Sequence, residues 1–213
     1  MAGRDSFELG RYTVAVSQYR KAANLAIVRD DGTAVAEAGY DLAVSQLAAN
    51  TPDDALKTTQ ATRQAVQLRG AQDMSSLDLV EAASHYRLGH YAQAIPLAQQ
   101  AMHSADTGVA ARAALVLGLA ADAQGDQSAL QAAGAYLSGL KQPLSVTQQA
   151  DRAEIQARVL RHTNPALAEQ QAEEAANLRQ GEAAYHDMAR ALALAARIAA
   201  SQGDQAKAHA LWA

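Results

Sequence analysis

The side chains best suited to chemistry in this sequence are its histidines and a small group of glutamates. Six histidines occur, and none has the H-E-x-x-H spacing that places two metal ligands on one helix face. His85 and His90 are five residues apart, and a glycine lies between them. We therefore expect the histidines to be helix-surface or junction residues rather than metal ligands.

The glutamates Glu169, Glu173 and Glu174 place two carboxylates on one helix face. Paired carboxylates can act as general acid and base, as they do in glycoside hydrolysis. A sugar site also needs aromatic side chains for stacking, and the chain has one Phe and one Trp. A solvated helix face is the better interpretation, so we expect a protein that is not an enzyme.

Other reaction and ligand classes lack the residues they need. The chain has no cysteine, which excludes disulfides, thiolate metal sites and cysteine nucleophiles. Neither a G-x-S-x-G motif nor a phosphate-binding glycine loop occurs. A net charge of −4 without any basic run argues against nucleic acid as a partner. No apolar run approaches the roughly 20 residues of a membrane span. We expect no metal, no cofactor and no direct membrane span.

The elements that carry these residues are predicted to be helices. About a quarter of the residues are alanine, the best helix former, and no long stretch alternates apolar and polar residues as a strand does. Turn-forming residues divide the chain into segments of roughly 12–20 residues, a normal helix length. The sequence therefore predicts an all-α fold of eleven helices with short connections.

The junctions between these helices recur at a steady interval. Equivalent junction positions are occupied by Gly10, Asn50, Gly89, Gly125, Thr163 and Gly203. Their successive spacings are 40, 39, 36, 38 and 40 residues. A fixed period of this length is typical of helical-repeat proteins and is not required of a non-repetitive bundle.

The residues after the junctions repeat as well. The pattern G-x-Y-x-x-A-x-x-x-Y-x-x-A of residues 10–22 returns in part as "GHYAQAIPLAQQA" at 89–101. Weaker copies include Ala55, Ala129, Ala133, Ala168, Ala172, Ala175, Ala208 and Trp212. This pattern resembles the second helix of the tetratricopeptide repeat (TPR), in a bacterial TPR-like form. Small residues also fall where that family has them in its first helix, at Ala43, Ala82, Gly118 and Ala196. The period here is longer than the TPR's 34 residues.

The resemblance implies an α-solenoid, a right-handed superhelix of about five and a half antiparallel helix pairs in a single domain, 1–213. Residues 6–28 would be the second helix of a first repeat whose partner helix is missing. The complete pairs would occupy 33–69, 75–105, 109–140, 145–179 and 182–213. In each, the glycine or the proline-containing junction reverses the chain tightly, and the alanine five residues later lies where two helices approach closely.

The first helix of each pair in such a solenoid lines a concave groove. Projected onto this chain, the groove positions give a partner-binding set of Tyr40, Tyr86, Arg87, Arg112, Arg161, Arg190 and Arg197. Arginine binds carboxylates bidentately, and tyrosine is favoured in recognition surfaces. We expect a non-catalytic scaffold or adaptor whose groove binds a protein or peptide partner, an acidic one for preference. Alternatively, these arginines are solvated or pair with acidic residues of neighbouring repeats.

A second hypothesis is a structural or accessory subunit of a bacterial envelope, pilus or secretion assembly. Trp212 and the unpaired first helix suggest uncovered apolar faces, through which such a subunit would self-associate. Alanine-rich repeat proteins of this style resemble bacterial ones, some of them lipoproteins with a removed leader. This favours the periplasm over the cytoplasm. An enzyme remains an alternative only with a catalytic domain outside these residues.

Overall fold

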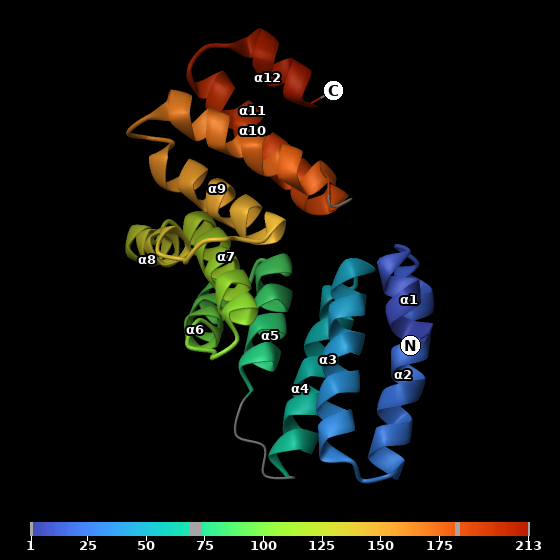
Figure 1. Cartoon of the computed structure of the whole chain (residues 1–213). Helices are drawn as coiled ribbons and strands as arrows, with labels where there is room; N and C mark the ends of the chain where they lie inside the picture. The colour runs from blue at the N-terminus through green and yellow to red at the C-terminus, as the bar shows by residue number, and fades with distance from the viewer. Residues whose placement is uncertain (1, 69–73, 182–183, 213) are drawn as a thin grey trace. The chain divides into compact units, whose positions relative to one another are not determined.

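The computed structural model describes residues 2–68, 74–181 and 184–212 (Figure 1). These ranges contain twelve helices and no strand, which confirms the all-α prediction. The expected break at 69–73 and the first two residues of the range 182–213 lie outside the described residues.

The chain divides into two compact units, Met1–Val116 and Leu117–Ala213. The first contains α1 (Ala2–Glu8), α2 (Tyr12–Val28), α3 (Gly32–Ala48), α4 (Pro52–Gln67), α5 (Ser75–Arg87) and α6 (Tyr91–Ala101). The second contains α8 (Gln127–Ser138), α9 (Val146–Leu160), α10 (Pro165–Gly181), α11 (Tyr185–Ser201) and α12 (Gln205–Trp212). Helix α7 (Thr107–Gln124) begins in the first unit and ends in the second.

Within each unit, helices that follow one another in the sequence pack together. In the first unit this holds from α1 to α6, and α3 also contacts α5 (Figure 1). In the second unit it holds from α8 to α12. Each of the five expected pair ranges contains two helices.

The segment 6–28, expected to be one helix, contains parts of two. Helix α1 ends at Glu8, and α2 begins at Tyr12. The rings of Phe7 and Tyr12 meet edge to face across this junction, with centroids 5.2 Å apart. Helix α1 is therefore the one described helix beyond the eleven that the sequence predicts. It packs on α2, where the sequence predicted no partner. Seven residues are too few for a helical period to be recognised.

The glycine junctions adopt a left-handed backbone. The φ angles are 71° at Gly10, 77° at Gly89, 81° at Gly125 and 86° at Gly203, and Asn50 follows with 61°. A left-handed residue after a helix end reverses the chain, and glycine does so without a clashing Cβ. The predicted tight reversal is confirmed at these five junctions.

Thr163 behaves differently from the other junction residues, because it is not in the left-handed region. A β-branched residue is strongly disfavoured there. Instead, the amides of Thr163 and Asn164 both donate to the carbonyl of Leu160, at 3.0 and 2.8 Å. Asn164 Oδ1 then accepts from the amide of Leu167 at 3.3 Å and so caps the start of α10.

The alanine five residues after a junction is buried in every clear copy. Ala15, Ala55, Ala94 and Ala168 are 0% exposed, and Ala208 is 6% exposed. After Gly125 the buried alanine comes one residue earlier, as the shifted copy in the sequence predicts. Their burial is consistent with the expectation that a methyl group at these positions allows close helix approach.

The small residues of the first helices are buried too. Ala43, Ala82 and Ala196 are 0% exposed. At Gly118 on α7, an added Cβ would lie 2.5 Å from Ile155 Cδ1 on α9 and 3.3 Å from Ala133 Cβ on α8. Three helices of the second unit therefore converge where only a glycine fits.

Candidate functional site

Helix α9 carries a row of charged side chains in the second unit. A capping box fixes its start, since Ser145 and Gln148 hydrogen-bond to each other's backbone amides. Asp151, Glu154 and Arg158 then follow at intervals of three and four residues, so they share one helix face. All three are buried. Buried charges require partners, and each of these has one on a neighbouring helix.

Glu154 is the fully buried centre of this row. Arg190 of α11 donates from Nε and Nη2 to its two carboxylate oxygens, both at 2.7 Å. Arg158 adds a third hydrogen bond at 2.9 Å. Burial by itself raises the pKa of Glu154, but Arg190 and Arg158 together lower it to about 2. Glu154 is therefore ionised at neutral pH.

Asp122, near the end of α7, joins the same network. It accepts from Arg158 Nη1 at 2.7 Å and from Arg161 Nη1 at 3.0 Å, both on Oδ2. The side chains of Asp122 and Arg158 are each 6% exposed, whereas Arg161 is 28% exposed. Arg158 thus connects a carboxylate on α7 with one on its own helix.

A second buried pair connects α9 to α10. Arg179 Nη2 donates to Asp151 Oδ1, and both side chains are almost fully buried. Asp187 of α11 lies 4.0 Å from Arg179 Nε and accepts from Arg190 Nη1 at 2.7 Å. The charge network formed by these contacts consists of Asp122, Asp151, Glu154, Arg158, Arg161, Arg179, Asp187 and Arg190. Its four arginines and four carboxylates balance, so the network is neutral.

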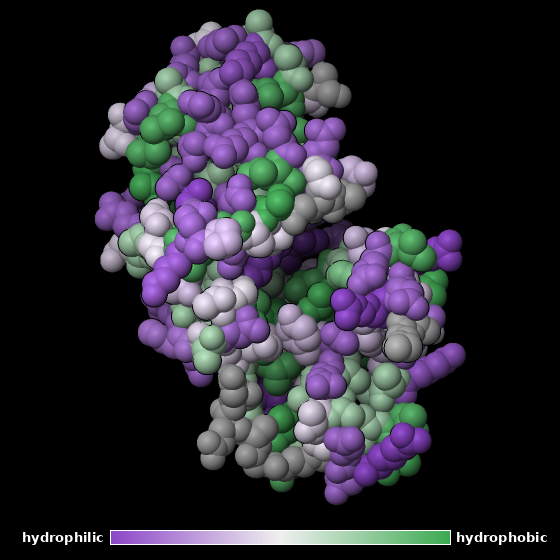
Figure 2. All heavy atoms as spheres, in the orientation of Figure 1, coloured by the Kyte–Doolittle hydropathy of each residue, from purple (hydrophilic) through white to green (hydrophobic). Residues whose placement is uncertain are grey.

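Two of the three arginines predicted to face a partner in the second unit belong to this network. Arg161 pairs with Asp122, and Arg190 pairs with Glu154 and Asp187, as the alternative interpretation expected. Arg197 is exposed and has no ion pair within the described part of the chain. Hydrophilic side chains cover much of the visible surface over α10 and α11 (Figure 2). Charge alone therefore does not mark a binding surface there.

The four predicted residues of the first unit are partly buried. Burial raises the pKa of Tyr40; Asp41 and Asp106 raise it further, and Arg112 opposes them. Tyr40 and Arg112 are thus brought close enough to interact electrostatically.

The remaining two predicted residues of the first unit, Tyr86 and Arg87, end α5. The rings of Tyr86 and Tyr91 have centroids 6.0 Å apart and planes inclined by 43°. Arg87 Nη2 donates to Asn50 Oδ1 at 3.1 Å. This hydrogen bond connects the end of α5 to the junction between α3 and α4.

The sequence reasoning missed an ionic cluster between α4 and α5. Arg63 Nη2 lies 2.6 Å from Asp78 Oδ1 and 2.8 Å from Glu81 Oε2. Asp78 and Glu81 are buried, whereas Arg63 is 21% exposed. Two carboxylates three residues apart in the apolar run "LDLVEAA" are the local signal that could have revealed it. This cluster holds the two adjacent helices together.

The acidic group on α10 is also occupied. Lys207 of α12 contacts Glu169 and lies 2.7 Å from Glu173 Oε1. Hydrogen bonds to Glu169 and then Glu173 raise the pKa of Lys207. Gln202 Nε2 donates to Glu169 at 2.7 Å. The expected solvated face is therefore wrong for Glu169, which is buried and neutralised from the neighbouring helices.

His85 and His90 form a close histidine pair at the junction of α5 and α6. His85 Nδ1 and His90 Nδ1 lie 3.5 Å apart. Within residues 2–68, 74–181 and 184–212, no three His, Cys, Asp or Glu side chains are grouped so that they could hold a metal ion.

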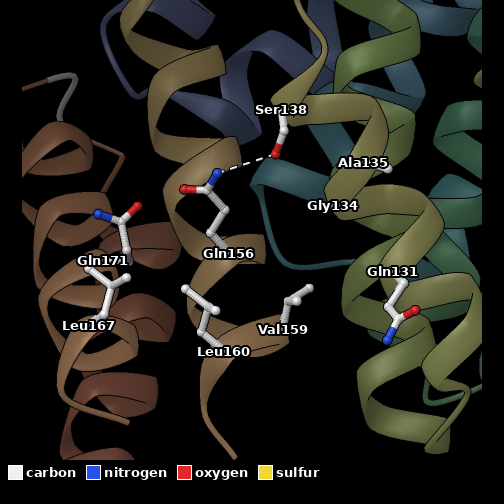
Figure 3. Close-up of a pocket in the computed structure, with 9 residues that line it drawn as sticks. All are labelled: Gln131, Gly134, Ala135, Ser138, Gln156, Val159, Leu160, Leu167 and Gln171. Atoms are coloured by element: carbon white, nitrogen blue, oxygen red, sulfur yellow. Dashed lines mark hydrogen bonds between the residues drawn. The ribbon is translucent and has the colours of Figure 1, made fainter. Parts of the chain in front are cut away.

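A second surface of α9 borders an open cavity of about 450 Å³. In Figure 3, α9 lies between α8 and α10 and side chains of all three helices surround the opening. It is lined by Gln131, Gly134, Ala135, Ser138, Gln156, Val159, Leu160, Leu167 and Gln171, which we call the amide groove. Gln156 Nε2 donates to Ser138 Oγ at 3.2 Å across it. No motif in the sequence indicated this groove.

The sequence shows no significant similarity to known families or curated proteins, so the class of this protein follows from its structure alone. None of the described helices is both long and apolar enough to cross a membrane. The chain is thus an all-α protein with two candidate surfaces in its second unit: the charge network and the amide groove.

Proposed function

We propose that this protein is a TPR-like helical-repeat scaffold that binds a segment of a protein partner and catalyses no reaction. The observation that carries the proposal is the recurring unit of a left-handed junction followed five residues later by a buried alanine. It occurs at Gly10, Asn50 and Gly89, and again at Gly203. Stacked helix pairs of this kind create extended surfaces for partners.

In this proposal the pairs stack as a right-handed superhelix, with first helices contacting first helices. Within the first unit, α3 contacts α5. Within the second, Asp122 and Arg158 join α7 to α9, and Glu154 and Arg190 join α9 to α11. Small-angle X-ray scattering tests the stacking. A compact globule of this length has a radius of gyration of about 17 Å, and a superhelix gives a clearly larger value. A value of about 17 Å would contradict the solenoid.

The partner segment would contact the first-helix face, where tyrosines and arginines remain partly accessible. Hydrogen bonds hold Arg87, Arg161 and Arg190 in place, so less side-chain entropy is lost when a ligand binds. Arg197 is exposed without an ion pair within the described residues and supplies a free guanidinium. The charge of Arg197 favours an acidic segment, because those of Arg161 and Arg190 are already neutralised within the charge network.

A capped tetrapeptide of glutamates tests this surface when titrated into the ¹⁵N-labelled protein at low salt. We expect amide shifts on the first helices. Arg197→Glu should weaken binding about fivefold, the size of one modest ion pair. Lys141→Glu is the matched control, because it makes the same charge change at an exposed connection. Equal weakening in both variants, or no binding, would contradict the proposed acidic segment.

Exposed apolar side chains favour the second candidate, a structural subunit that self-associates. On α2, Leu25 is 49% and Val28 is 82% exposed, and Trp212 on α12 is 63% exposed. Such side chains are favoured in contacts between protein copies. Light scattering over a hundredfold range of protein concentration tests this candidate. A constant monomer mass excludes it, whereas a mass that rises in the wild type and not in Val28→Lys supports it.

A further inference from the structure

The amide groove and the charge network occupy opposite faces of α9. At 100° per residue, Gln156, Val159 and Leu160 centre about 160° away from the row of Asp151, Glu154 and Arg158. The groove is therefore a separate surface from the one that carries the arginines, and its role does not depend on theirs.

The chemistry of the groove is uncharged and mixed. None of its nine lining residues carries a charge. Val159, Leu160 and Leu167 provide apolar contact, and Leu167 is 39% exposed. Polar groups come from Ser138 and the side-chain amides of Gln131, Gln156 and Gln171. A combination of apolar side chains and a few polar groups is typical of ligand sites.

Two of the glutamines keep hydrogen-bonding capacity for a ligand. Gln131 makes no side-chain hydrogen bond within the described part of the chain, and Gln156 uses its amide nitrogen while its oxygen accepts from no described group. A side-chain amide offers both a donor and an acceptor, which is what a peptide backbone requires. A charged ligand would lose hydration here without gaining an ion pair.

The dimensions select a short segment. Gln131 and Ser138 are seven residues apart on α8, which corresponds to about 10 Å along the helix axis. About three residues of extended chain, at roughly 3.3 Å each, cover that length. The volume of about 450 Å³ lies within the usual range of ligand pockets, about 300–1,000 Å³.

We infer that the amide groove binds an extended, uncharged protein segment of about three residues. Its central apolar side chain contacts Val159, Leu160 and Leu167, and its backbone amide groups hydrogen-bond to Gln131 and Gln156. The groove adds a second recognition surface to the protein, selective for neutral apolar segments where the arginine-bearing face favours acidic ones.

The test uses a capped tripeptide with leucine between two serines, titrated into the full ¹⁵N-labelled chain. We expect saturable amide shifts on α8, α9 and α10. Replacing the leucine by aspartate or lysine should weaken binding about tenfold or more, because the charge is desolvated without a partner. Arg197→Glu, which disrupts the arginine-bearing face, should leave tripeptide binding unchanged.

Two alanines on α8 provide a matched pair of blocking variants. Ala135 lines the groove and Ala132 does not, and both are exposed, so either accepts a larger side chain without disturbing the core. Ala135→Trp should abolish the shifts, and Ala132→Trp should preserve them. Equal effects of the two variants, or equal binding of the charged tripeptides, would overturn the inference. So would shifts in the same helices that follow protein concentration without peptide, because the groove would then hold a second copy.

Discussion

The two faces of α9 differ in how far their polar side chains are already paired with other residues of the protein. On one face, Asp151, Glu154 and Arg158 are buried, and each is paired with a charge on another helix. On the opposite face, Val159 and Gln156 are half-buried and uncharged. The charges of the first face hold α7, α9, α10 and α11 together. Charge in an alanine-rich helix therefore marks where helices are fastened, and an uncharged mixed surface can be the one left for a ligand.

Removing the central carboxylate should have the largest effect. Glu154→Ala removes the buried carboxylate shared by Arg158, which is buried, and Arg190, which is partly buried, and breaking a buried ion pair in this way costs about 3–5 kcal/mol. The free energy of unfolding, measured by urea titration with circular dichroism, should fall by that amount. Glu174→Ala, at an exposed position of α10, is the control and should change it by less than about 0.5 kcal/mol. Similar losses in the two variants would show that the network does not hold the helices.

Acid should weaken the charged face in a defined pH range. The folded-state pKa of Glu154 is about 2, below its ordinary value of 4.5. Its contribution to stability is therefore complete above about pH 4.5 and is lost as the pH falls toward 2. The difference corresponds to something on the order of 3 kcal/mol. Urea unfolding of wild type and Glu154→Gln, compared from pH 6 to pH 2.5, should show the gap between them narrowing. A gap independent of pH would mean that Glu154 is not the group responsible.

The packing of α7 against α9 can be tested at Gly118, which faces Ile155. Gly118→Ala places a Cβ 2.5 Å from Ile155 Cδ1, and such overpacking costs about 1–3 kcal/mol. Ile155→Val removes the clashing Cδ1, so the double variant should recover part of the loss. Urea unfolding of the two single variants and the double variant gives their coupling energy. Additive effects would show that α7 and α9 adjust without strain.

The repeated features of the fold could be predicted because they are local. Glycine adopts a left-handed φ at a helix end without steric cost, and Gly89 and Gly203 adopt it. Alanine five residues later is buried both after the left-handed junction at Gly89 and after Thr163, as Ala94 and Ala168 show. Helix α1 was missed because it is too short to display a period.

The candidate sites could be predicted only in part, because they depend on which helices become neighbours. The arginines were recognised as a group, but Asp122 lies 39 residues before its partner Arg161, and Glu154 lies 36 residues before its partner Arg190. No local pattern specifies such partners. The amide groove needs small side chains on α8 beside leucines on α9 and α10, and each of these is unremarkable in its own helix.

Replacing a junction glycine should cause the smallest loss of stability among these variants. It also leaves both faces of α9 intact, so it serves as a reference for them. Gly125 has a φ of 81° with nothing within 4 Å of an added Cβ, so Gly125→Ala should cost about 1 kcal/mol through the backbone alone. Gly181→Ala, also free of contacts but at a helical residue without positive φ, should be neutral or slightly stabilising. Thermal unfolding separates the two. The tripeptide should bind both variants as it binds the wild type, so weaker binding by Gly125→Ala would mean that the groove depends on stability and not on its own lining.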